Sequence, residues 1–140
     1  MNKDIEGVTF SGGEPLLQSK ALYQLGLILK ENDLSIVTFT GFSYDLIEDV
    51  NDFNWNNLIS ITDILISGEY KQEESTVDKI WVGSLNQEYH FLSDKYKNLE
   101  DKLDTMENKI EIRLGKDGRI IVNGMADNKK IKEIFKNITF

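Results

Sequence analysis

The 140-residue chain contains no cysteine and a single proline, and its basic residues are outnumbered by acidic ones. Without cysteine, the chain itself forms no disulfide and gives no thiolate to a zinc ion or an iron–sulfur cluster. The 16 lysine and arginine residues against 24 aspartate and glutamate residues leave a net charge of −8. This charge argues against a general nucleic-acid binder, which needs basic surface to displace counterions, and it also disfavours binding to an anionic membrane.

Long hydrophobic runs are also missing. No apolar stretch approaches the roughly 18 to 20 residues that cross a bilayer, and residues 1–6 have no apolar signal-peptide core. We therefore expect a cytoplasmic protein with no membrane or nucleic-acid partner. At 140 residues and 40% hydrophobic content, the chain can build one core, so we expect a single domain over 1–140, with a βα core in 1–93 and appended elements in 94–140.

The stretch from Ile5 to Gln18 contains the main functional signal. Val8 and Phe10 alternate with polar residues as in a strand, and Gly12 and Gly13 then allow a tight turn. Pro15 suits the first position of a helix, in which Leu17, Ala21, Leu25 and Leu29 are predicted to share the apolar face. A turn between a strand and a helix is a common place for ligands in α/β folds.

Two more apolar runs end at glycine and alternate with predicted helices. They cover residues 34–40 and 62–67, and helices are expected from Ser43 to Val50 and from Trp55 to Ile59. This rhythm predicts a parallel sheet, with a fourth strand over residues 89–92. The strand ends should meet at one edge, where polar side chains could converge on a ligand: Ser11, Glu14, Thr38, Thr40 and Ser67.

The C-terminal third leaves this rhythm. Residues 94–108 have the apolar spacing of an amphipathic helix, which we interpret as core packing. Residues 109–114 and 119–123 flank a glycine-containing turn and predict a β-hairpin, and a last helix is expected over residues 128–136.

Four segments in the same order resemble the radical S-adenosylmethionine enzymes, in particular the activating enzymes of anaerobic ribonucleotide reductase and pyruvate formate-lyase. They are Gly-Val-Thr-Phe-Ser-Gly-Gly-Glu-Pro-Leu (7–16), Phe-Thr-Gly-Phe (39–42), Asp-Ile-Leu-Ile-Ser-Gly (63–68) and Gly-Ser-Leu-Asn-Gln (83–87). The resemblance implies an α/β fold, a partial parallel (β/α) barrel with a C-terminal antiparallel hairpin and helix.

The resemblance also implies a set of residues that bind S-adenosylmethionine. Ser11, Gly12, Gly13 and Glu14 would hold its methionine amino group, using turn carbonyls and the carboxylate. Thr38 or Thr40 would lie near its carboxylate or ribose. The remaining implied contacts are Ser67 and, near the adenosyl end or the rim, Ser84 and Asn86.

The chain departs from the family at the cluster. The family holds a 4Fe-4S cluster on Cys-x3-Cys-x2-Cys before the Gly-Gly-Glu motif, whereas only eleven residues precede Gly12 here and none is cysteine. Aspartate often replaces Ser67 in the family, and arginine often replaces Trp81. We therefore expect this chain to ligate no cluster and assign it no catalytic or metal-binding residue.

Two functional hypotheses stay open. In the first, the chain is a fragment or truncated form of a radical S-adenosylmethionine activating enzyme, not competent alone, whose partner is a glycyl-radical enzyme such as an anaerobic ribonucleotide reductase. In the second, it is a non-catalytic remnant that binds S-adenosylmethionine or a partner. Lacking the family's first strand, the sheet should be open beside Val8 to Ser11, which favours an upstream cluster-bearing segment, a partner chain or a dimer.

Other chemistry-bearing residues have simpler interpretations. His90 lies in an apolar run and is expected to be structural. Glu69, Glu73 and Glu74 could form a metal cluster, but solvated loop charges are the simpler interpretation. Trp55 and Trp81 could stack on adenine, although aromatic residues at element ends usually pack in the core or at its rim.

Overall fold

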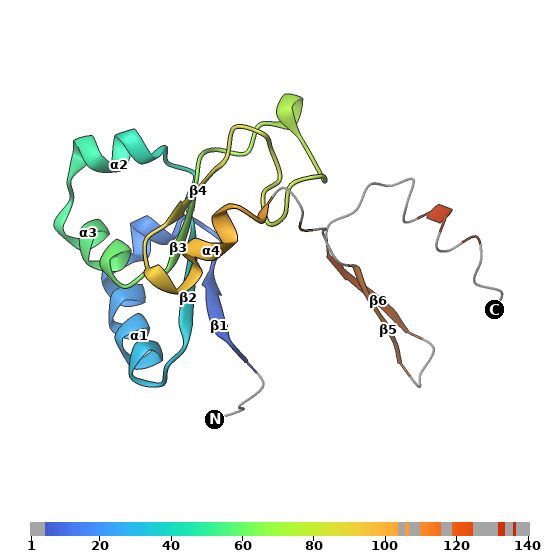
Figure 1. The fold of residues 1–140 in the computed structure, drawn as a ribbon, viewed down its shortest axis with the longest axis horizontal. Helices are drawn as coiled ribbons and strands as arrows, with labels where there is room; N and C mark the ends of the chain where they lie inside the picture. The colour runs from blue at the N-terminus through green and yellow to red at the C-terminus, as the bar shows by residue number, and fades with distance from the viewer. Residues whose placement is uncertain are drawn as a thin grey trace.

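A computed structural model of the chain describes residues 5–103, 106, 110–115, 119–124, 132, 133 and 136. Its centre is a four-stranded sheet with helices on both sides (Figure 1). The strands lie in chain order: β1 (Gly7–Phe10), β2 (Ser35–Phe39), β3 (Ile64–Ser67) and β4 (Glu88–Phe91).

The sheet is mostly parallel, as predicted, with one reversal. β1, β2 and β3 run parallel, whereas β4 pairs antiparallel with β3 through Ile64 opposite Phe91. The α/β class and all four strand positions are thereby confirmed. The barrel stays a prediction, because the described strands form an open sheet with β1 at one edge and β4 at the other.

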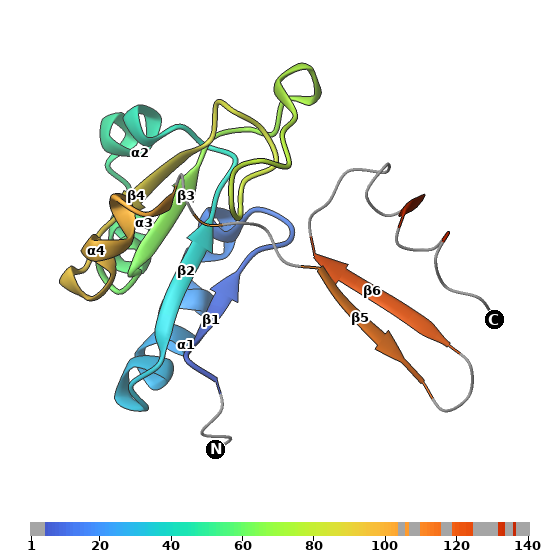
Figure 2. The ribbon, with the colours of Figure 1, turned by 45° about the vertical axis from the view of Figure 1, so that its right-hand side comes forward.

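The connections between the parallel strands are helical. A 3₁₀ turn, η1 (Pro15–Gln18), leads into α1 (Ser19–Glu31), and β2 is followed by α2 (Tyr44–Val50) and α3 (Phe53–Ser60). Ser43 and Asp52 cap α2 and α3, since each side chain accepts from a backbone N–H of the first turn. These three helices lie on the same side of the sheet (Figure 2).

The face of α1 that packs on the sheet differs from the prediction. Leu17 is 73% exposed and Leu25 is 45% exposed, whereas Leu16 and Gly26 are buried. The 3₁₀ geometry of η1 changes the phase of the pattern, because 3₁₀ turns have fewer residues than α-helical ones. Gly26 then lets α1 approach its neighbours: a Cβ there would lie 2.2 Å from Cδ1 of Ile61.

Each face of the sheet has its own hydrophobic core, because successive side chains of a strand point to opposite faces. On the face under α1–α3, the buried residues are Phe10, Leu16, Ile36, Ile47, Leu58 and Leu65. On the other face, Ile64 and Ile66 pack with Val82 from the loop before β4. A 3₁₀ turn, η3 (Asp94–Tyr96), and the short α4 (Lys97–Glu100) lie on this second face (Figure 1).

The C-terminal predictions are met in part. The helix expected over 94–108 is shorter, ending at Glu100, and residues 104, 105 and 107–109 lie outside the described residues. The hairpin is confirmed as β5 (Ile110–Leu114) and β6 (Ile120–Gly124), paired antiparallel. Most of the expected helix over 128–136 lies outside the described residues. Within the described part, no helix has the length and apolarity needed to span a membrane.

A buried carboxylate joins α1 to the start of β3. Asp63 is 4% exposed and accepts hydrogen bonds from the Lys30 ammonium and from the backbone N–H of Ile36, the latter at 2.8 Å. Burial by itself raises the pKa of Asp63, but these bonds outweigh it and hold the pKa below its ordinary value. Asp63 therefore stays ionised and fixes the spacing of α1, β2 and β3.

We predict that Lys30→Met lowers the free energy of unfolding by about 3 kcal/mol at neutral pH, because it leaves the Asp63 carboxylate buried without its cation. Because the folded-state pKa of Asp63 is lowered, its contribution to stability is present at neutral pH and is lost as the pH falls through that pKa. In the variant that acid-dependent loss should become smaller, because removal of the Lys30 ammonium raises the folded-state pKa of Asp63 toward its value in the unfolded chain. Urea unfolding measured from neutral to acidic pH checks both statements.

The matched control is Lys97→Met, which removes an exposed ion pair with Asp94, 2.6 Å long, and should leave stability unchanged. Equal stability of Lys30→Met and the parent would contradict the role given to Asp63.

Candidate functional site

The turn between β1 and η1 is open to solvent. Ser11, Gly12 and Gly13 are exposed, and the two glycines have φ angles of +85° and +58°. A Cβ added to Gly12 would meet no atom within 4 Å. The glycines therefore allow a backbone conformation that residues with a side chain rarely adopt. Because they carry no side chain, a ligand can approach their backbone closely.

The Glu14 carboxylate binds this turn to the next one. Its Oε1 accepts from the N–H of Leu16 at 3.0 Å and from Oγ1 of Thr40 at 2.8 Å, and its Oε2 accepts from the N–H of Gly41 at 2.8 Å. The side chain thus caps η1 and fixes the carboxyl end of β2 beside that of β1. A carboxylate offers about four acceptor positions, so one position on Oε2 remains.

Backbone hydrogen bonds extend this connection to β3. The N–H of Thr40 donates to Ile66 O at 2.9 Å, and the N–H of Gly68 donates to Phe42 O at 3.0 Å. The carboxyl ends of all three parallel strands are consequently joined at one edge of the sheet. The convergence of polar side chains on a ligand at this edge stays a prediction.

The Gly83–Gln87 segment closes its own loop against the end of β3. The Gln87 side chain donates to Gly68 O at 3.2 Å and accepts from the N–H of Gly83 at 2.8 Å, and Asn86 Nδ2 donates to Glu69 O at 2.8 Å. Ser84 is fully buried, and its Oγ accepts from the N–H of Lys71 at 3.2 Å. Asn86 Oδ1 is buried with no hydrogen-bond partner among the described residues.

A cavity of about 440 Å³ lies between these turns, at the carboxyl ends of β2 and β3. Ser67 and Asn86 line it, together with the first residues of α2 and with Gly68. The Ser11–Glu14 turn is not part of its lining. The turn and the cavity are nevertheless neighbours, because Glu14 bonds to Thr40 and Gly41, and Gly41 and Phe42 line the cavity.

Two of the predicted binding residues point elsewhere. Thr38 is fully buried, and its hydroxyl bonds that of Thr62 at 2.9 Å on the α1–α3 side of the sheet. Ser84 is enclosed in its loop. The structure brings Glu14 and Thr40 into direct contact and places Ser67 and Asn86 on one cavity, and all nine ligand assignments stay predictions. Sequence reasoning missed that the backbone N–H of Gly41 donates to the Glu14 carboxylate. The only signal in the sequence was the place of Gly41 directly after a predicted strand.

His90 is held by a hydrogen bond and by ring stacking. Its Nε2 lies 2.8 Å from Oγ of Ser67, and its ring stacks on Tyr44 with centroids 4.1 Å apart. Burial lowers the pKa of His90, while the Glu88 and Glu48 carboxylates act in the opposite direction. The neutral imidazole is therefore favoured, as expected of a structural histidine.

The loop carboxylates are not assembled as metal ligands. Glu74 lies 3.5 Å from the Lys71 ammonium, in an exposed ion pair. Within the described ranges, no three histidine, aspartate or glutamate side chains gather closely enough to hold a metal ion. Trp55 stacks on Phe42 at 5.0 Å in the core under α3, whereas Trp81 lies on the other face of the sheet.

Comparison with known proteins agrees with the sequence motifs. Residues 1–90 match the profile of a family described as a 4Fe-4S single cluster domain. An anaerobic ribonucleoside-triphosphate reductase-activating protein of Haemophilus influenzae is 32% identical over 89 residues, which are 61% of this chain and 55% of the relative. The chain therefore spans about half the length of that curated relative. No solved structure matches the chain significantly.

We predict that Glu14→Gln lowers the free energy of unfolding by about 2 kcal/mol. The carboxylate accepts three hydrogen bonds, and in glutamine the NH₂ group would face at least one of the same donors without being able to accept from it. Exchange of the Gly41 amide hydrogen should accelerate in parallel. Chemical denaturation and hydrogen-exchange NMR measure the two effects. Glu73→Gln, in the exposed loop, is the control and should change neither; unchanged Gly41 exchange in Glu14→Gln would refute the bridging role.

Proposed function

The chain belongs to the 4Fe-4S single cluster domain family, among the radical S-adenosylmethionine activating enzymes, and from that premise we propose that it forms the S-adenosylmethionine-binding part of such an enzyme. The observation that carries the proposal is the Glu14 bridge, which holds an exposed, glycine-lined turn rigidly beside the end of β2. A rigid turn of this kind binds a ligand with little loss of conformational freedom on binding.

The chemistry of the turn suits the amino-acid end of S-adenosylmethionine. An ammonium group needs oxygen acceptors, and a charge-assisted bond is roughly twice as strong as a neutral one. Glu14 has one acceptor position left on Oε2, and the backbone of Gly12 is uncovered. We assign the methionine amino group to these acceptors, with Glu14 also positioning the turn.

The donor set of the chain does not fit a 4Fe-4S cluster. Such clusters are held by cysteine thiolates, and none of the 140 residues is cysteine. Residues 1–140 are accordingly not competent alone for reductive cleavage of S-adenosylmethionine.

The name of the Haemophilus influenzae relative supplies the proposed partner. That protein activates an anaerobic ribonucleoside-triphosphate reductase, and we assign to this chain a glycyl-radical enzyme of the same kind. The second candidate function is non-catalytic binding of S-adenosylmethionine or of a partner, which the absence of cysteine favours.

The test is calorimetric titration of S-adenosylmethionine into residues 1–140, with Gly12→Ala and Gly124→Ala as a matched pair. Both glycines have positive φ angles, +85° and +125°, so alanine should strain each backbone by about 1–2 kcal/mol. Only Gly12 lies at the proposed site. We expect binding by the parent and by Gly124→Ala, and at least about tenfold weaker binding by Gly12→Ala.

A second titrant separates the two ends of the ligand. 5′-Methylthioadenosine lacks the amino-acid group and should bind much more weakly if the turn holds the methionine end. The absence of heat with S-adenosylmethionine, or equal affinity for the two compounds, would contradict the proposal.

A further inference from the structure

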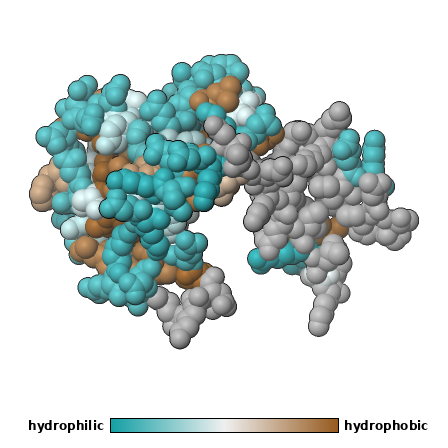
Figure 3. All heavy atoms as spheres, viewed as in Figure 1, coloured by the Kyte–Doolittle hydropathy of each residue, from teal (hydrophilic) through white to brown (hydrophobic). Residues whose placement is uncertain are grey.

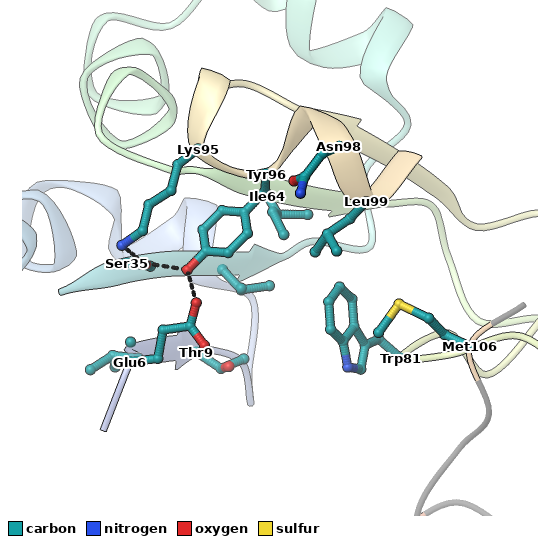
Figure 4. Close-up of a pocket in the computed structure, with 13 residues that line it drawn as sticks. Glu6, Thr9, Ser35, Ile64, Trp81, Lys95, Tyr96, Asn98, Leu99 and Met106 are labelled. Carbon is teal, nitrogen blue, oxygen red and sulfur yellow. Dashed lines mark hydrogen bonds between the residues drawn. The ribbon is translucent and has the colours of Figure 1, made fainter. Parts of the chain in front are cut away.

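A cavity of about 590 Å³ lies beside Trp81, on the face of the sheet opposite α1 (Figure 4). One acidic and one basic side chain line it, and hydroxyl groups join the two. The Tyr96 hydroxyl donates to Glu6 at 2.7 Å and lies 2.6 Å from Oγ of Ser35, which accepts from Lys95 at 2.7 Å. Charge is therefore balanced at this cavity, and the net charge of −8 is carried elsewhere on the chain.

Residues 31–70 carry negative charge that no cation of the same segment balances. The segment has no lysine, arginine or histidine, whereas it has eight acidic residues: Glu31, Asp33, Asp45, Glu48, Asp49, Asp52, Asp63 and Glu69. Asp63 is buried and paired with Lys30. Asp45, Glu48 and Asp49 are exposed on α2, and none of them pairs with a lysine or arginine in the part of the chain that the structure describes. The uncompensated charge is thus concentrated on α2.

An exposed apolar row runs along α2 beside an acidic row. Leu46 and Val50 are four residues apart, so they share one face of the helix, and they are 41% and 50% exposed. Asp45 and Asp49 have the same spacing one position earlier, which places them in the neighbouring row, on the side away from the buried Ile47. The helix α2 therefore presents an apolar row and an acidic row to solvent together.

Phe53 extends the apolar surface beyond the end of α2. It is the first residue of α3 and is 74% exposed. It follows Val50 by three residues, so the two Cα atoms are within about 11 Å of each other. An apolar group reaches the surface at the left edge of Figure 3, at the bend where α2 joins α3 in Figure 1. Exposed aromatic side chains of this kind are enriched at the centres of protein interfaces.

We propose that the α2 surface, formed by Asp45, Leu46, Asp49, Val50 and Phe53, is the docking site for a basic amphipathic segment of a partner polypeptide. The apolar side chains of the segment cover the apolar row and the phenyl ring, and its lysine or arginine side chains pair with the acidic row. This inference does not rest on binding of S-adenosylmethionine, because it uses no residue of the Ser11–Glu14 turn.

The cavity of about 440 Å³ at the carboxyl ends of β2 and β3 adjoins this surface, since Asp45 belongs to both. Glu69 and Glu88 also line the cavity. Its lining includes one cationic side chain, Lys71, whose ammonium already lies 3.5 Å from the Glu74 carboxylate. A lysine or arginine side chain of the docked segment would therefore find an excess of carboxylates there, and we assign one basic side chain of the partner to this cavity.

The charge of the α2 surface selects the partner. Nucleic acids and anionic membranes have the same sign of charge as the acidic row, so both are repelled. Two copies of the chain that met through α2 would bring their acidic rows together, which is also unfavourable. A basic segment is attracted during the encounter and then removes the apolar row from water. A basic amphipathic polypeptide is consequently the occupant that matches both rows.

The test is a titration of residues 1–140 into a fluorescently labelled synthetic peptide of about 15 leucine and lysine residues, with the apolar spacing of an amphipathic helix. Fluorescence anisotropy reports binding. We expect binding that weakens as sodium chloride is added, because salt screens exposed charges. A peptide with glutamate in place of every lysine should not bind.

Two matched pairs of variants locate the binding surface. Phe53→Ser and Leu17→Ser alter side chains that are 74% and 73% exposed, on different elements. Phe53→Ser should weaken binding at least about tenfold, and Leu17→Ser should leave it unchanged. Asp49→Asn and Asp33→Asn each remove one exposed carboxylate. Only Asp49→Asn should weaken binding, by about threefold at low salt and by less at high salt.

Absence of binding by the parent, equal binding of the glutamate peptide, or equal loss in Phe53→Ser and Leu17→Ser would overturn the proposal. A further arm tests the chain's own residues 128–140, in which four lysines stand among apolar residues. If that segment occupied the α2 surface, the full chain carrying Ile131→Ser and Phe135→Ser would bind the peptide at least about tenfold more tightly than the parent, and the proposal would fail. Equal binding supports a partner polypeptide.

Discussion

The Glu14 carboxylate is the interaction on which the ligand-facing edge of this fold depends. Parallel strands end in separate turns, and nothing in a βα unit by itself fixes one turn against the next. Glu14 does so with its two carboxylate oxygens. They accept hydrogen bonds from the backbone N–H of Leu16 in η1, from Oγ1 of Thr40 and from the backbone N–H of Gly41. Because the carboxylate is committed to these bonds, the flexible glycines before it are held in a defined conformation while they remain exposed. Rigidity and access, which usually oppose each other, are thereby combined in one turn.

The same reasoning separates binding residues from supporting ones. Polar side chains on the α1–α3 side of the sheet, such as Thr38 and His90, bond to neighbours within the fold, and Gln87 closes the loop before β4. They determine where the strand ends lie. A ligand at this edge would meet the backbone of the first turn and the cavity beside Ser67 and Asn86. Motif residues here thus serve mainly to hold three turns together, and few atoms remain for a ligand.

Much of this arrangement was predictable from the sequence, because alternation, glycine and caps are local signals. The four strands, the two short helices and the hairpin followed from them. The buried face of α1 did not, because it depends on the 3₁₀ turn at Pro15 and on the close approach at Gly26 to Ile61. The direction of β4 and the orientation of Thr38 depend on which strand pairs with which. The Ser11–Glu14 site was found through its glycines and its carboxylate, whereas the Gly41 N–H carries no side-chain signal, and a cavity between β1 and Trp81 is a product of long-range packing alone.

The edge of β1 that pairs with no strand among the described residues adjoins the cavity beside Trp81. A folded chain normally buries its apolar stripes and protects its outermost strand, since both are otherwise sites of uncontrolled association. The unpaired edge at β1 lies beside the turn to which the proposed ligand is assigned. A contact made at this edge would therefore also act on the conformation of that turn, because β1 leads directly into it.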